Sequence, residues 1–397
     1  MKKTLLALSL PFICASVATG QNGSLDSTYN LVGIVKTATS PGGDDIGNAL
    51  LAQSDAKIII IGSSDDDTDY TLIRYNVDGS LDNTFGTGGI VTQDVNGSLD
   101  EGRAAVLQPD GKIIVTGRTG PNWSKKNFTS RHHSNGTLDT SFGTNGFSFV
   151  TDEDAVPETV SLQTDGKIVI VGDYLGPNDR DQLIWRFDGN GNLDNTFGTN
   201  GVTSTDSTYS LWGMSSAIQS DGKIIVGGYT STSPSDFMVM RYNSNGVLDN
   251  SFGTNGIATT DVNSNVIAQA YSVLIQSDGK ILLGGWADNG TANYDFCVVR
   301  YNTDGSIDNT YGNGGIALID VNNNSTDYGR SMILLPNDKL VLAGYAHKSG
   351  ADFALITLLS DGTLDTSFGI NGKVFTDIGG SWDKAYSVVL TANNKIV

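Results

Sequence analysis

Three observations predict an all-β fold made of repeats. A motif close to Gly-x-Leu-Asp-x-x-Phe-Gly occurs seven times, with consecutive copies 55 to 59 residues apart. A second marker, Asp-Gly-Lys or a near variant, follows the same interval. Each repeat also holds four short segments rich in the β-branched and aromatic residues that favour strands. Together they predict a seven-bladed β-propeller of four-stranded antiparallel blades.

The two markers stay in step along the whole chain. The first motif begins at Gly23, Gly79, Gly136, Gly191, Gly246, Gly305 and Gly362. The second begins at Asp55, Asp110, Asp165, Asp221, Asp278, Asn337 and Asn393. A β-solenoid would need shorter repeats, and tandem modules would need linkers, so a ring of blades is the interpretation that remains.

One repeat, residues 271–321, illustrates the four strands. We name them A ("YSVLIQ"), B ("KILLGG"), C ("FCVVRYN") and D ("GIALID"). Strand C is apolar in both alternating sets of residues, which is typical of a strand packed between two layers. The Asp-Gly-Lys marker is the A–B turn, and the Leu-Asp-x-x-Phe motif is the C–D connection.

The two ends of the chain are out of phase with the repeat. "GIVK" at Gly33 reads as a D strand that precedes any A strand, and the sequence ends at Val397 inside the seventh B strand. We therefore expect the N-terminal D strand to complete the last blade, which is incomplete in this sequence. We also expect the rest of that blade to lie beyond Val397.

The composition limits the partners and the location. The formal net charge of -19 argues against a basic surface for nucleic acid. Residues 1–20 carry Lys2 and Lys3, an apolar run and small residues, so we predict a secretory signal peptide. Residues 21–397 form the predicted propeller, without a membrane span. We expect a secreted monomer, extracellular or at the cell surface.

"LQPDGKIIVTG" and "DFMVMRYNSNGVLDNSFGTNGI", with their sister copies, resemble the delta-60 repeat family of bacterial secreted proteins. The resemblance covers residues 23–397. It implies a β-propeller and export, often with a C-terminal sorting domain that this chain does not show. It implies no known reaction, substrate or catalytic residue.

The C–D connections resemble calcium loops, but their first ligand position is held by a cation. In the first complete copy Arg74 stands where a carboxylate would be needed, before Asn76, Asp78 and Asp82. We therefore interpret the motif as turn chemistry. In this interpretation Asp82 and its equivalents cap backbone N–H groups or pair with the Arg.

The diversity of the loops predicts where a ligand would bind. The A–B and C–D connections are repeated turns at one end of the ring, whereas the B–C and D–A connections at the other end vary in every repeat. Binding residues concentrate on variable loops of a rigid scaffold. The candidates on this face are Trp123, Trp212, Trp286, Trp382, Asp65, Asp66 and Asp67.

Alternatives stay open for both groups of candidates. The tryptophans suit a sugar or a peptide, or they fill gaps between blades. The acidic run, which Asp69 extends, suits a hard cation such as Ca²⁺, although a solvated loop is the favoured interpretation.

The predicted function is that of an exported binding scaffold for an extracellular glycan, peptide or surface partner. No catalytic residue, resident cofactor or transition-metal site is predicted, because the sequence holds three His and no nucleophile-elbow motif. We therefore expect no enzyme. The alternative is an extracellular carbohydrate-active hydrolase that uses Asp residues of the channel.

Overall fold

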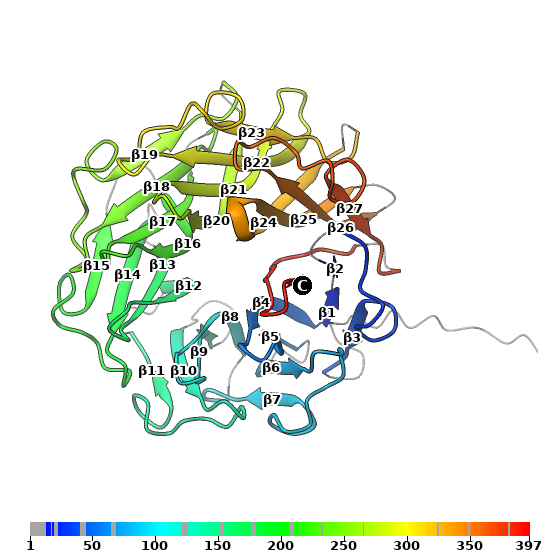
Figure 1. Cartoon of the computed structure of the whole chain (residues 1–397). Helices are drawn as coiled ribbons and strands as arrows, with labels where there is room; N and C mark the ends of the chain where they lie inside the picture. The colour runs from blue at the N-terminus through cyan, green and yellow to red at the C-terminus, as the bar shows by residue number, and fades with distance from the viewer. Residues whose placement is uncertain are drawn as a thin grey trace, which may run out of the picture.

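The computed structural model of the protein shows six four-stranded antiparallel sheets arranged as blades around one axis (Figure 1). It describes residues 13–16, 18–19, 23–39, 45–64, 69–97, 99–120, 126–150, 155–175, 180–205, 210–231, 233–264, 266–323, 325–347, 350–379 and 382–397. Within each blade the strands follow chain order from the centre outward, as predicted for A to D.

We number the blades I to VI in chain order. The innermost strands, A, are β4 (Ile46–Ala52), β8 (Asp100–Leu107), β12 (Ala155–Leu162), β16 (Leu211–Ile218), β20 (Ala268–Ile275) and β24 (Asp327–Leu334). The B strands are β5 (Ile58–Ser63), β9 (Ile113–Thr119), β13 (Ile168–Leu175), β17 (Ile224–Thr230), β21 (Ile281–Asp288) and β25 (Leu340–His347). The C strands are β6 (Tyr70–Tyr75), β10 (Lys126–His132), β14 (Arg180–Phe187), β18 (Phe237–Tyr242), β22 (Tyr294–Tyr301) and β26 (Ala351–Leu358). The outer strands, D, are β7 (Ile90–Gln93), β11 (Phe147–Ser148), β15 (Val202–Thr205), β19 (Ile257–Thr260), β23 (Ile316–Ile319) and β27 (Lys373–Thr376).

The prediction of seven blades is wrong, because the described residues form six. The predicted N-terminal D strand is β3 (Ile34–Thr37), which pairs with β1 (Ile13–Ser16) instead of completing a blade. After β27 the described chain forms only β28 (Lys395–Ile396), which pairs with β2 (Ala18–Thr19). An outer strand needs a C strand beside it, and none follows β28 in the described chain. The export signal over residues 1–20, where β1 and β2 lie, stays a prediction.

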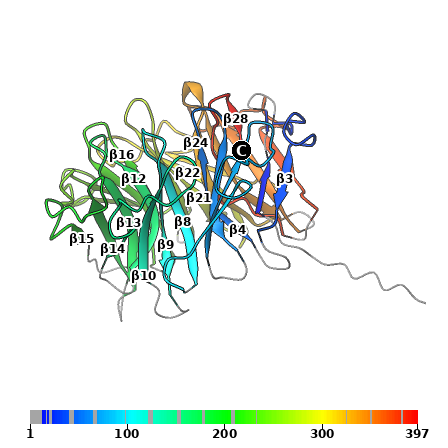
Figure 2. The same cartoon turned by 90° about the horizontal axis from the view of Figure 1, so that it is seen from below.

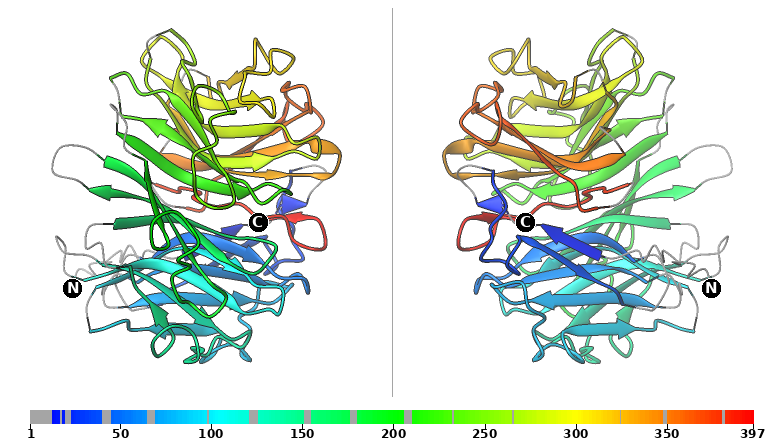
Figure 3. Two further views of the ribbon diagram at one scale, coloured as in Figure 1. Left: turned by 90° about the vertical axis from the view of Figure 1, so that its left-hand side faces the viewer. Right: turned by 90° about the vertical axis from the view of Figure 1, so that its right-hand side faces the viewer.

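Between blades VI and I the C-terminal segment lies beside the N-terminal strands, where β28 pairs with β2 (Figure 3). The Nζ of Lys395 forms an ion pair with Asp26. Asn30 N–H donates to the carbonyl of Asp78 in blade I at 2.7 Å. A Lys from the last Asp-Gly-Lys-like turn thus contacts an Asp from the first Leu-Asp motif, so described segments of the first and last repeats connect blades VI and I.

The hydrophobic core is divided among the interfaces between blades, which stand side by side around the axis (Figure 2). Between blades I and II, for example, Ile59 and Ile61 pack with Ile113 and Val115. The B and C strands are buried on both faces, which confirms the layered packing predicted from strand C. The only helical element described is a short 3₁₀ turn, η1 (Pro336–Asp338), and no helix among the described residues has the length and apolarity to cross a membrane.

The Asp of the repeated C–D connection is the centre of a buried ionic cluster. In blade I, Asp82 Oδ2 lies 2.8 Å from Arg74 Nε of strand C and 2.8 Å from Lys57 Nζ of the A–B turn. Its Oδ1 accepts hydrogen bonds from the backbone N–H and the hydroxyl of Thr84. Burial alone would raise the pKa of Asp82, but the hydrogen bonds of Lys57 and Thr84 and the charge of Arg74 outweigh it, so the pKa lies well below its usual range. Both predicted roles of this Asp, turn capping and pairing with Arg, are confirmed.

The same cluster also joins each blade to the next. In blade V the Arg300 guanidinium lies 4.5 Å from the ring centroid of Tyr311, and its Nη1 donates to the carbonyl of Ser360 in blade VI at 2.5 Å. In blade VI, where the position of the Arg is Thr357, Lys339 Nζ alone pairs with the Asp at 2.7 Å. The other Arg–Asp pairs are Arg131–Asp139, Arg186–Asp194 and Arg241–Asp249.

We expect Asp308→Asn to lower the free energy of unfolding at pH 7 by about 2–4 kcal/mol, because it leaves the buried Arg300 without a carboxylate and removes one of the two carboxylates beside Lys280. The folded pKa of Asp308 is lowered, so this stabilisation is fully present above the unfolded pKa of about 4 and is lost as the pH falls through the folded value. Urea unfolding at several pH values measures both effects. Asp278→Asn removes the same charge from an exposed side chain, and equal effects of the two substitutions would contradict the prediction.

Candidate ligand-binding face

The β-bulges of the A strands place chemically different side chains at one height around the inner ring. In every blade the pairing of A with B shifts register at the same position, and a bulge re-aims the side chain of the extra residue. The six bulged residues are all half-buried. They are Asn48, Arg103, Glu158, Met214, Tyr271 and Arg330. The backbone bulge is the same in every blade, whereas the type of side chain at the bulge varies, as expected for a ligand-binding surface on a rigid scaffold.

Blades II and III contribute a charged sector to this ring. Arg103 Nη2 lies 2.6 Å from Glu158 Oε2 and its Nη1 lies 3.0 Å from Glu101 Oε1. Arg103 Nε also donates to the carbonyl of Pro157 at 3.0 Å. Burial raises the pKa of Glu158, and the adjacent Arg103 opposes that shift. Both carboxylates are therefore engaged with one Arg.

Blades IV to VI and the C-terminal segment contribute an aromatic sector. Trp212 stacks on Tyr229 at 5.5 Å between ring centroids, and Tyr229 lies 5.9 Å from Tyr271. Farther along, Tyr328 lies 4.9 Å from Tyr345 and 5.3 Å from Trp286. At its C-terminal end the sector reaches the exposed ring of Trp382, which contacts His347. We define the aromatic sector as Trp212, Tyr229, Tyr271, Trp286, Tyr294, Tyr328, Tyr345, His347 and Trp382.

Two cations lie on the rings of the aromatic sector. The Arg330 guanidinium is 4.2 Å from the ring centroid of Tyr271, and its Nη2 donates to the hydroxyl of Tyr345 at 3.3 Å. Lys384 Nζ is 5.1 Å from the ring centroid of Trp382 and 5.2 Å from that of Tyr345. No carboxylate of the described residues forms an ion pair with either cation. Aromatic rings, and for Arg330 also the hydroxyl of Tyr345, surround the two charges, so an anion can still approach them.

The structure distributes the four predicted tryptophans unequally. Trp382 is 64% exposed, and it is held to blade VI by a bridge to Ala351. Trp212 is half-buried, and Trp286 is only 6% exposed, so it fills space between neighbouring rings. Trp123 lies outside the described residues, as do Asp65, Asp66 and Asp67.

Sequence reasoning missed the bulge residues and the tyrosines of the aromatic sector. A signal for the bulge residues exists, since each one differs from repeat to repeat inside an otherwise regular A strand. The tyrosines have no such signal, because tyrosine in a strand reads as core.

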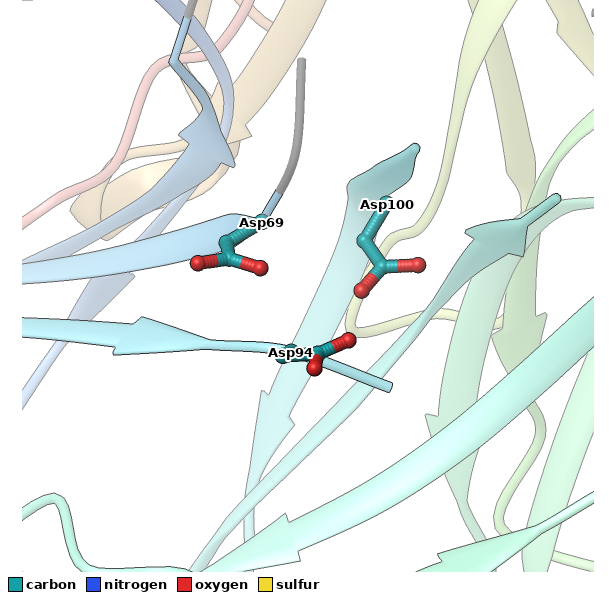
Figure 4. A group of neighbouring side chains, drawn as sticks. All are labelled: Asp69, Asp94 and Asp100. Carbon is teal, nitrogen blue, oxygen red and sulfur yellow. The ribbon is translucent and has the colours of Figure 1, made fainter. Parts of the chain in front are cut away.

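Three acidic triads lie at junctions between blades. In the first, Asp69 precedes strand C of blade I, Asp94 follows strand D, and Asp100 begins strand A of blade II. One carboxylate oxygen from each lies within 4.8 Å of the others, and Figure 4 shows the three carboxyl groups directed toward a common space. The structure thus joins Asp69 of the predicted acidic run to two residues that the sequence analysis did not select. The other triads are Asp295, Asp320 and Asp327, and Asp352, Asp377 and Asp383.

All three triads share one backbone contact. The N–H that follows the second Asp donates to the third Asp: Val95 to Asp100 at 2.6 Å, Val321 to Asp327 at 2.9 Å, and Ile378 to Asp383 at 2.8 Å. Burial raises the pKa of Asp100 to about 6, and the charges of Asp94 and Asp69 add to the shift. Burial likewise raises the pKa of Asp295 to about 6, with the charges of Asp320 and Asp327 acting in the same direction.

A family described as a domain of unknown function, DUF5122, a β-propeller, matches six segments that make up more than half of the chain. The segments are residues 53–85, 108–142, 163–197, 219–252, 276–311 and 335–368. The chain belongs to this family. Each segment runs from the end of strand A to the aromatic residue of the C–D connection, so it contains the A–B turn, strands B and C with their connection, and the Leu-Asp motif. The D–A connections and the bulged residues of the A strands lie outside the matched segments.

Solved structures resemble the chain at low identity, and no curated protein matches it. A polysaccharide lyase of family PL25, an ulvan lyase bound to -[GlcA(1-4)Rha3S]-, is 12% identical with a TM-score of 0.49, over 81% of this chain and 84% of that one. The PQQ-bound aldose sugar dehydrogenase of Streptomyces coelicolor is 10% identical with a TM-score of 0.47, over 88% and 99%. A protein of unknown function from Dyadobacter fermentans DSM 18053 is 14% identical with a TM-score of 0.46, over 72% and 85%. At these values the likenesses carry nothing about activity or ligand.

We expect the exposed part of the aromatic sector to be measurable by fluorescence quenching. Trp382→Phe should remove a large share of the acrylamide-quenchable emission, because the Trp382 ring is mostly exposed, whereas Trp286→Phe should leave that share unchanged. Steady-state quenching of the two variants checks this. Equal losses would contradict the burial described for Trp286.

Proposed function

We propose that the chain is an exported binding protein whose aromatic sector takes an anionic carbohydrate. The observation that carries the proposal is the exposed end of that sector, where Trp382 is open to solvent and is followed in the sequence by Lys384 and by Tyr386, a further exposed aromatic residue outside the sector. Aromatic faces provide large, rigid, amphipathic contact surfaces, which suit the flat apolar faces of sugar rings. Export is supported by the N-terminal segment and by the resemblance to the delta-60 repeat family.

The charge of the ligand follows from Arg330 and Lys384. In a chain with a net charge of -19, a polyanion is repelled by most of the surface. Arg330 and Lys384 form a local exception, because aromatic rings rather than carboxylates surround them. A carboxylate or sulfate on the sugar would supply the missing counter-charge.

We infer binding without catalysis. Glycosidic hydrolysis needs an acid and a base on opposite sides of the scissile bond. In the charged sector, Glu101 and Glu158 both contact Arg103 and are thus held as structural partners.

The ligand class can be tested with dextran, dextran sulfate and polyglutamate by titration calorimetry on the full chain. We expect dextran sulfate to bind at least about tenfold more tightly than the uncharged polymer, because only the sulfates differ. Trp382→Ala and Lys384→Gln should each weaken binding about tenfold, as is typical of an aromatic or cationic hot spot. Ile370→Ala is the matched control, since it removes an 82% exposed apolar side chain from the C–D connection of blade VI.

Three results would contradict this function. If Trp382→Ala and Lys384→Gln both bind dextran sulfate with unchanged affinity, the aromatic sector is not the binding site. If polyglutamate binds with the same affinity as dextran sulfate, the ligand class would be an acidic peptide and not a carbohydrate. Shorter chains after incubation with dextran sulfate or polygalacturonate, detected by size-exclusion chromatography, would favour the hydrolase alternative.

A further inference from the structure

The acidic triads are built from the same three positions of the repeat. The first position precedes or begins strand C, the second follows strand D, and the third begins or precedes strand A of the following repeat. At the junction of blades II and III, Lys126 stands at the first position and Ala155 at the third. At the junction of blades IV and V, Asp236 and Asp261 are present and Ala268 replaces the third.

The third carboxylate is absent from these two junctions, so it is not required by the fold. Where Ala268 stands, Ser235 replaces the polar contact: its hydroxyl donates to the carbonyl of Ala268 at 3.1 Å, and the N–H of Ala268 donates to the carbonyl of Ser235 at 2.8 Å. A blade junction can therefore close without a triad. Three neighbouring carboxylates at a junction repel one another, so the presence of all three in the triads needs an explanation other than the fold.

A buried, unsatisfied oxygen provides a second and independent observation. Asp295 is 4% exposed. Its Oδ2 accepts from Asn289 Nδ2 at 3.1 Å, whereas its Oδ1 has no hydrogen-bond partner among the described residues. The same carboxyl group contributes a ligand atom within 4.8 Å of those of Asp320 and Asp327. A buried carboxylate oxygen without a donor is costly unless a cation approaches it.

We propose that the acidic triads bind Ca²⁺ and thereby join neighbouring blades. Ca²⁺ is bound by six to eight oxygens at about 2.3–2.6 Å, so two oxygens on one ion can be up to about 5 Å apart. The spacing within the triads satisfies this limit. Mg²⁺ holds its ligands at about 2.0–2.1 Å in a strict octahedron, which needs a tighter and more regular set.

The bound ion would join the paired ends of strands C and D of one blade to the start of strand A of the next, with which they share no ladder. Asp295 and Asp320 belong to blade V, and Asp327 begins strand A of blade VI. The ion would therefore act at the variable end of the junction, opposite the Arg–Asp clusters of the repeated turns. This inference does not depend on the carbohydrate proposal.

The test uses the full chain after treatment with a chelator and dialysis, with Ca²⁺ alone as the probe. We expect calorimetry to detect up to three sites with dissociation constants of about 10⁻⁵–10⁻³ M. Saturating Ca²⁺ should raise the melting temperature by about 2–5 °C, because it binds only the folded state. Mg²⁺ at the same concentration should give a smaller rise.

Matched variants assign the sites. Asp94→Asn and Asp320→Asn should each remove one site and part of the rise in melting temperature. Asp94 is exposed, so its substitution does not threaten folding. Asp261→Asn removes the same charge at the junction of blades IV and V, where the third carboxylate is missing, and it should leave the number of sites unchanged.

The outcomes separate a built site from general acidity. No binding at 10 mM Ca²⁺ (about tenfold above the weakest expected dissociation constant) would overturn the proposal. So would an equal loss of sites in Asp261→Asn and Asp320→Asn, because it would indicate diffuse attraction to a chain of net charge -19. An equal or larger stabilisation by Mg²⁺ would overturn the choice of Ca²⁺.

Discussion

The buried Asp of the C–D connection is the interaction on which the ring depends. One carboxylate, such as Asp308, accepts from its own turn and pairs with Arg300 and Lys280, which come from strand C and from the A–B turn. The same Arg also reaches a carbonyl of the next blade. Two connections and one strand of the blade, and the position of its neighbour, are therefore fixed around a single side chain. A substitution at this point affects both the blade and the junction.

Because the repeated end fixes the blades, the opposite end is free to vary. The A strands illustrate this division: a bulge is kept at one position in all six, while its side chain changes from Asn48 to Arg103, Glu158, Met214, Tyr271 and Arg330. A bulge leaves its extra residue outside the ladder, so the side chain can change without a change in pairing.

The strand order and the role of the turns could be predicted from the sequence, because both are set by local and periodic patterns. The number of blades could not. Seven copies of a motif give seven blades only if every copy has four strands to pair, and the first and last copies do not: Asp26 and Lys395 meet, but β3 and β28 pair with N-terminal strands. Counting motifs therefore overestimated the number of blades by one.

The acidic triads show a second limit of sequence reasoning. Asp69, Asp94 and Asp100 come from two connections and two blades. In the sequence, the acidic run that includes Asp69 stands out only by its density of charge. The informative pattern is the recurrence of an Asp directly after strand D, at Asp94, Asp261, Asp320 and Asp377, combined with one at the start of the next A strand. Each Asp alone is ordinary for a loop, and only the packing of one blade against the next segment of the chain places the positions together.

The positions of the triads also connect the two proposals physically. Asp327 directly precedes Tyr328, and Asp383 lies between Trp382 and Lys384. The carboxylates that would hold an ion at the last two junctions are thus next to the rings and the cation that would hold a sugar. Asp383 N–H donates to the carbonyl of Ala351 at 2.6 Å and its Oδ2 accepts from Ile378 N–H, so the Trp382 segment is tied to blade VI through this residue. A cation bound at these junctions would neutralise their charge and make the exposed end of the aromatic sector more rigid. That would lower the entropic cost of ordering the site when a ligand binds.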